Sequence, residues 1–122
     1  MTTTSATYGP NHVEVETFLN LMSTLTKEQW RAAVALPLGR AWTAAQDAVW
    51  DDNRDDAWDN AQKSARRVTW SAAPWDARDS AVQSVTWAAR ALVVRDLISP
   101  EDFDILTASM WAAGIDFDTL SA

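Results

Sequence analysis

Residues 41–70 read AWTAAQDAVWDDNRDDAWDNAQKSARRVTW, and this stretch decides the fold class. It is rich in residues that favour helix, above all Ala, and it contains neither Gly nor Pro. The whole 122-residue chain has only 3 Gly and 4 Pro, too few for a turn-rich β fold. No segment shows the alternation of apolar and polar residues that is typical of strands. We therefore predict an all-α protein, a compact bundle of about five helices with a long central helix pair at about 40–71 and 75–97.

A four-residue repeat runs through this stretch. Its first place holds mostly small residues, its second place holds large or long ones, and its third place is often Asp. Four residues turn an ideal helix by about 400°, so each repeat drifts by about 40° around the helix axis. The Trp side chains would therefore spiral around one long helix, unless that helix bends or breaks near DDNRDD, residues 51–56. In both cases we expect at least one of Trp42, Trp50 and Trp58 to lie outside the core of the monomer.

Capping residues and helix breakers predict the remaining helix ends. Asn11 and Glu14 have capping-box spacing ahead of a helix at about 12–24. Thr26 and Gln29 repeat the pattern ahead of a second helix. The other boundaries are a stop near 36–40, a break or kink at Pro74, a start at Ser99-Pro100 and an end at Gly114.

The length and the charge of the chain limit its class. A chain of this length is one domain, so we expect a flexible N-terminus at 1–10 and a single helical domain at 11–122. The net charge of −7 argues against binding to nucleic acid and to anionic membrane surfaces. No apolar run approaches the roughly 20 residues that span a bilayer, and no signal peptide is evident. We therefore expect a soluble cytoplasmic protein.

The Asp residues of the repeat have three interpretations. Like charges four residues apart on a helix repel by a few tenths of a kcal/mol per pair. The acids therefore form a solvated face, an acidic contact surface or, with the least support, a site for a divalent metal. We predict no metal site and no cofactor, because no second set of acids or His converges on them. The predicted partner-binding residues are Trp42, Trp50, Trp58, Asp47, Asp51, Asp55 and Asp59.

The sequence offers little for catalysis. The chain has no Cys, and its sole His, His12, sits at a predicted helix start where we expect it on the surface. No G-x-S-x-G, Gly-rich phosphate loop, H-E-x-x-H or EF-hand loop occurs. A pair of carboxylates remains open as catalytic machinery, since Asp is abundant. We predict that the protein is not an enzyme and assign no catalytic residues.

Part of the chain resembles a known group of proteins. Tetrads of the A-W-D-A, A-R-D-A and A-W-A-A types, followed by VVRDLIS at 93–99, resemble small Trp/Ala/Asp-rich proteins encoded by actinobacteria and their phages. The matching parts are 41–71, 87–99 and AAGIDFDTL at 112–120. That group carries no assigned enzymatic activity. The resemblance implies a phage or accessory protein that binds a host component, in the cytoplasm of the host cell.

Two functional hypotheses follow. The first is a non-enzymatic helical protein-interaction module, a phage-encoded modulator of a host protein, because Trp is strongly enriched at binding hot spots. The alternative is an acidic mimic of nucleic acid that blocks a DNA- or RNA-binding protein through its Asp residues. We also expect a homodimer with Trp50 or Trp58 at its interface, because a two-fold dimer is the commonest way to cover a self-complementary apolar patch. The same surface would then compete for the host partner.

Overall fold

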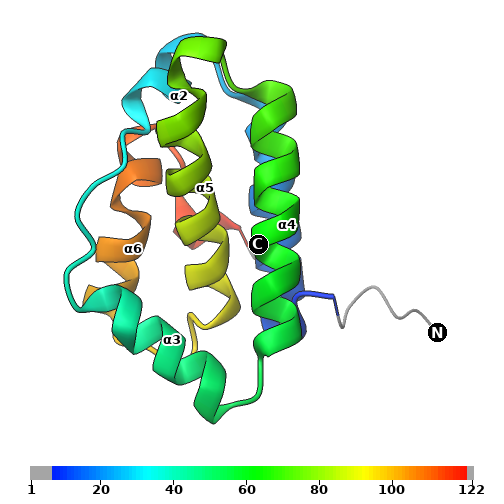
Figure 1. Ribbon diagram of the computed structural model, residues 1–122, viewed down its shortest axis with the longest axis vertical. Coiled ribbons are helices and arrows are strands. Elements are labelled where there is room, and N and C mark those ends of the chain that lie inside the picture. The colour runs from blue at the N-terminus through cyan, green and yellow to red at the C-terminus, as the bar shows by residue number, and fades with distance from the viewer. Residues whose placement is uncertain (1–6, 121–122) are drawn as a thin grey trace.

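The computed structural model describes residues 7–120 and confirms the predicted all-α bundle. Its α-helices are α1 (His12–Leu21), α2 (Lys27–Ala32), α3 (Ala41–Asp51), α4 (Asp55–Ala72), α5 (Arg78–Val93) and α6 (Pro100–Ala112). Figure 1 shows α4 and α5 side by side and antiparallel, with α6 beyond α5 and α3 across the lower end of the bundle. Helix α1 lies behind α4 and contacts both α4 and α5. None of the helices in the described range is both long enough and apolar enough to cross a membrane.

The helix predicted at 40–71 is not continuous: of the two alternatives, the break near residues 51–56 is the one observed, and it divides the stretch into α3 and α4. Helix α3 ends at Asp51, and α4 begins at Asp55. Between them Asn53 has a φ of 55°, a left-handed conformation that Asn adopts more readily than most residues. The backbone N–H of Arg54 donates to the Val49 carbonyl at 3.0 Å and closes the end of α3. The two helices therefore meet at a corner, which Figure 1 shows at the bottom of the bundle.

Pro74 ends one helix and does not merely kink it. The residue before it, Ala73, is extended with a ψ of 142°, as the proline ring requires of its neighbour. A 3-10 turn at Trp75–Ala77 then reverses the chain. The helix predicted at 75–97 is consequently shorter at both ends, since α5 spans Arg78–Val93. The reversal brings α5 back along α4, and these two helices make the most extensive contact in the bundle.

The first place of the four-residue repeat is the buried place. Each repeat drifts by about 40° around the helix axis, but α3 and α4 are short. The small residues of each helix therefore remain near one side of it, where they can be buried together. The skipped first place is Asn53, which lies exposed in the corner. The buried first-place residues are Ala41, Ala45 and Val49 of α3 and Ala57, Ala61, Ala65 and Thr69 of α4. We call these seven residues the small-residue seam.

The repeat continues beyond the predicted stretch. In α5 the residues at the same four-residue spacing, Ala81, Val85, Ala89 and Val93, are buried as well. The one polar member of the seam, Thr69, donates its hydroxyl to the Ala65 carbonyl at 2.7 Å, so no hydrogen-bonding group is left unpaired there. Small side chains on the facing sides of α4 and α5 let the two backbones approach closely.

The predicted helix caps are confirmed in two cases and wrong in one. Thr26 and Gln29 form the capping box at the start of α2. The hydroxyl of Ser99 accepts from the Asp102 backbone N–H at 3.1 Å at the start of α6. Asn11 does not cap α1, since its side-chain amide donates to the Leu92 carbonyl at 3.0 Å instead. The side chain of Asn11 therefore bonds to the distant residue Leu92 and not to the backbone of the first turn of α1. The predicted helix at 12–24 is α1 followed by a 3-10 turn, Met22–Thr24.

The described part of the predicted flexible N-terminus packs against α4. The Tyr8 hydroxyl donates to the Ser64 hydroxyl at 2.8 Å, and the Asn60 amide donates to the Thr7 carbonyl at 2.9 Å. Gly9 has a φ of 73°, and a Cβ at this position would lie 3.3 Å from the Cβ of Ala57. Glycine therefore permits both the turn and the close approach. Residues 1–6 of that prediction lie outside the described residues.

Candidate functional site

The corner between α3 and α4 encloses an open hollow of about 320 Å³. The last turns of α3 supply one wall and the first two turns of α4 supply the other. The hollow exists because the chain turns at Asn53, so residues that one continuous helix would spread around its axis now face each other across a corner. We call this cavity the corner hollow. Its lining consists of Gln46, Val49, Trp50, Asp55, Trp58 and Asp59.

The corner hollow brings together four of the seven predicted partner-binding residues, namely Trp50, Trp58, Asp55 and Asp59. The other three lie on α3 outside its lining and are exposed: Trp42, Asp47 and Asp51. Trp42 is 43% exposed and lies eight residues before Trp50, about 12 Å along the helix. Asp51 lines a different hollow, beside Asp52 and Leu97.

Trp50 and Trp58 differ in burial, although both line the hollow. Trp50 is 80% exposed, the largest value among the large apolar side chains of the described chain. Trp58 is half-buried, and its ring meets that of Trp87 edge to face with the centroids 5.9 Å apart. The Arg90 guanidinium lies over both rings, 4.9 Å from the Trp58 centroid, and burial lowers its pKa. Trp58 thus forms a wall that belongs partly to the core, whereas Trp50 is exposed to solvent.

The rim of the corner hollow is acidic. Asp55 and Asp59 are exposed, and Asp59 has an ion pair with Lys63 at 3.1 Å, one turn further along α4. Such an exposed pair contributes little to stability and leaves the carboxylate accessible. The first turn of α4 favours the acids Asp55 and Asp56, because the positive end of the helix dipole lies there. Across the described residues, no three carboxylate or imidazole groups lie close enough to hold a metal ion.

An ion-pair network behind the corner escaped the sequence prediction. The guanidinium of Arg54, which is 8% exposed, donates to both carboxylate oxygens of Asp96 at 2.7 and 2.9 Å. It also donates to the Val93 carbonyl at 2.9 Å and to Asp52 at 2.7 Å. The hydrogen bonds from Arg54 lower the pKa of Asp96 to about 2. The network ties the corner to the end of α5 and so fixes the hollow, and the only hint in the sequence was a single Arg among six acids.

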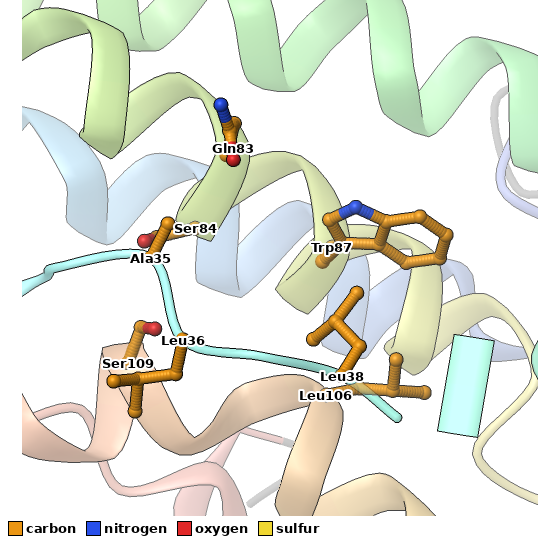
Figure 2. A pocket seen from close by; sticks show the side chains of 8 residues that line it. All are labelled: Ala35, Leu36, Leu38, Gln83, Ser84, Trp87, Leu106 and Ser109. Atoms are coloured by element: carbon orange, nitrogen blue, oxygen red, sulfur yellow. The ribbon is translucent and has the colours of Figure 1, made fainter. Parts of the chain in front are cut away.

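A second cavity, of about 110 Å³, lies beneath the extended segment that joins α2 to α3. Figure 2 shows Leu38, Trp87 and Leu106 gathered on one side of it, with the hydroxyls of Ser84 and Ser109 on the other. Both hydroxyls are already used, because Ser84 donates to the Ala33 carbonyl at 2.9 Å and Ser109 to the Val34 carbonyl at 2.6 Å. The two serines therefore hold the segment in place, and Gln83 is the one other polar residue among the described residues that line the cavity.

His12 is also part of the architecture. The sequence predicted it on the surface, which is wrong, because only 9% of the residue is exposed. Its ring stacks on that of Tyr8 with the centroids 5.1 Å apart, and its Nε2 lies 3.4 Å from a Glu16 carboxylate oxygen. Packing accounts for its position.

No protein-family model, curated protein or solved structure matches this chain.

Proposed function

We propose that this chain is a non-enzymatic protein-interaction module that binds its partner at the corner hollow. The observation that carries the proposal is the 80% exposure of Trp50 beside a hollow of about 320 Å³. Leaving so large an apolar side chain in water is unfavourable, and Trp is among the residues most enriched where partners bind. The Trp50 indole supplies a protruding anchor, and the hollow beside it supplies a socket.

The rim selects the chemistry of the partner. Asp55 and Asp59 border the hollow, and Asp47 and Asp51 are exposed on the adjoining helix. A complementary surface would present an apolar side chain flanked by Lys or Arg. The acidic rim would speed the encounter with such a surface and repel acidic ones, whereas the apolar contact would supply most of the affinity.

The resemblance to proteins of actinobacteria and their phages gives this proposal a setting. In that setting the chain is a phage-encoded modulator that occupies a site on a host protein in the host cytoplasm. The alternative, an acidic mimic of nucleic acid, is favoured by one specific observation: Asp47, Asp51, Asp55 and Asp56 are all exposed, and none of them has an ion pair with another described residue. The two proposals differ in whether Trp50 or charge dominates binding.

Affinity capture from an actinobacterial lysate tests the proposal. Three immobilised chains are compared, namely the unmodified chain, Trp50→Ala and Trp75→Ala. Trp75 is a matched control because it is 78% exposed and does not line the hollow. We expect the unmodified chain and Trp75→Ala to retain the same protein through a wash in high salt, and Trp50→Ala to lose it. A truncated hot-spot Trp typically weakens binding by about 2 kcal/mol or more, roughly thirtyfold.

Other results contradict the proposal in distinct ways. The acidic mimic would be favoured if the chain captures a nucleic-acid-binding protein, if moderate salt releases that protein, and if Trp50→Ala still binds it. Capture of the same protein by all three chains in high salt would place the contact elsewhere. Turnover of a substrate by the purified chain, with no protein captured, would contradict both proposals.

A further inference from the structure

The exposed face of α4 is sorted by charge along its length. Its residues at spacings of four, four, three and four lie on one side of the helix, and all of them are exposed. Acids occupy the end near the corner hollow, and bases followed by a Trp occupy the other end. We call this set the α4 stripe; it consists of Asp55, Asp59, Lys63, Arg66 and Trp70.

We propose that two copies of this chain pair antiparallel along their α4 stripes, with Trp70 of each copy seated in the corner hollow of the other. The proposal rests on the corner hollow being a binding surface, as argued above, and names a second copy of the chain as an occupant. A two-fold axis through the middle of the stripe would make the contact self-complementary, so each interaction occurs twice.

Charge complementarity selects this orientation. With the axis between Gln62 and Lys63, Asp59 of one copy lies opposite Arg66 of the other, and Asp55 lies opposite Trp70. A parallel pairing would instead set acid against acid and base against base, which is unfavourable. Arg66 is available for the contact, because it has no ion pair or side-chain hydrogen bond with any other residue in the range 7–120.

Trp70 has the form of an anchor for the hollow. It is 53% exposed, and the Arg78 guanidinium lies over its ring, 4.6 Å from the centroid. This cation–π contact restrains the indole and so reduces the entropy lost on binding. The corner hollow, at about 320 Å³, lies at the lower end of the roughly 300–1,000 Å³ typical of ligand pockets, room enough for one aromatic side chain.

The area is adequate for a specific contact. Each copy contributes two exposed indoles, Trp50 and Trp70, and an aromatic side chain of this kind buries about 150–250 Å² when it is covered. Because Trp70 is already about half covered, the four indoles supply only part of the roughly 1,000 Å² that a specific interface needs, and the charged residues between them supply the rest. Because each chain carries a net charge of −7, the general repulsion between copies keeps the affinity modest.

Light scattering on the full chain tests the pairing. At hundreds of micromolar we expect a mass approaching twice the 13.5 kDa of one chain. Asp59→Arg and Arg66→Asp should each weaken association by at least about tenfold, because each sets like charges against one another at both contacts. Trp70→Ala should weaken it comparably, and Trp75→Ala should leave it unchanged. An equimolar mixture of Asp59→Arg and Arg66→Asp should associate again, since every facing pair is then opposite in charge.

The mixture separates this interface from a simple loss of fold, because two misfolded chains would not restore each other. A monomer at hundreds of micromolar would overturn the pairing and leave the capture experiment to judge the host-partner proposal by itself. A dimer that is unaffected by Trp70→Ala and by both charge reversals would also overturn it. The same holds if the two charge-reversed chains fail to associate when they are mixed.

Discussion

Arg54→Ala is expected to lower the free energy of unfolding by about 2 to 4 kcal/mol, because it removes a buried guanidinium whose charge the remaining donor of the network, the neutral amide of Asn11, cannot replace. The Arg54 guanidinium joins Asp96, Asp52 and the Val93 carbonyl, all within 2.9 Å. Its loss leaves the Val93 carbonyl without this donor and two carboxylates without a counter-charge. Urea denaturation followed by circular dichroism measures the effect.

Two controls sharpen this prediction. Arg54→Lys keeps the charge but cannot form the two parallel hydrogen bonds to Asp96, so we expect an intermediate loss. Arg67→Ala removes an exposed Arg from α4 and should change the free energy of unfolding by less than about 0.5 kcal/mol. Equal stability of Arg54→Ala and the unmodified chain would mean that the network does not hold the corner.

The same network predicts part of the pH dependence. Arg54 lowers the pKa of Asp96 from 3.8 to about 2 in the folded chain, so the carboxylate stabilises the fold above about pH 4. This contribution is lost as the pH falls from 4 towards 2. Because 47% of the Asp96 side chain is exposed, solvent screening limits the contribution to roughly 1 kcal/mol. Arg54→Ala should lack this part of the acid sensitivity.

Ala65→Leu is expected to destabilise the protein by about 1 to 3 kcal/mol, because added methyl and methylene groups have no space in the small-residue seam. Ala65 is fully buried on α4, at 0% exposure. By propensity alone the change is nearly neutral, since Ala and Leu are both good helix formers. The loss therefore measures the closeness of packing. Thermal and urea unfolding of the variant check it.

Lys63→Leu is the matched control for Ala65→Leu. It introduces the same side chain on the same helix, two residues earlier, at an exposed position. We expect a change within about 0.5 kcal/mol there, measured at submicromolar concentration where chains do not associate. If both variants are equally stable, the seam is loosely packed and the four-residue repeat has another cause.

Local signals in the sequence predicted most of the fold. The capping box at Thr26, the cap at Ser99 and the end of a helix before Pro74 all depend on residues within a few positions of each other. The sequence placed a possible break at residues 51–56 but did not decide whether it occurs, because Asn and Asp have only mildly poor helix propensities and many helices tolerate them. Tertiary contacts decide whether residues 41–70 form one long helix, covered by other elements on several sides, or two helices separated by a break.

Those contacts join residues that are far apart in sequence. Arg54 and Asp96 are separated by 42 positions, and Asn11 reaches Asp96 across 85. No spacing rule applies over such distances, so the network that fixes the corner was missed. The period of four was noticed, but its meaning depended on where the helices end: in short helices it collects small residues in the core, and in one long helix it would have spread them around the axis.

The expectation that at least one of Trp42, Trp50 and Trp58 lies outside the core is confirmed. A chain with 8 Trp residues cannot bury all of them in a domain of this size, and Trp50 is the most exposed. The sequence could not predict that Trp58 is half-buried while Trp50 is exposed, because Trp58 is covered by Trp87 and Arg90 of α5.

We propose that the corner turns Trp50 outward as a contact surface, and the structure places this indole outside the core at 80% exposure. The most direct test is the free energy of unfolding of Trp50→Ala at submicromolar concentration, with Trp58→Ala measured beside it. We expect Trp50→Ala to match the unmodified chain within about 0.5 kcal/mol. Trp58→Ala should lose at least about 1 kcal/mol, because its indole packs against Trp87 and Arg90. A loss of several kcal/mol in Trp50→Ala would show that this indole belongs to the core, which contradicts its proposed role as a contact surface.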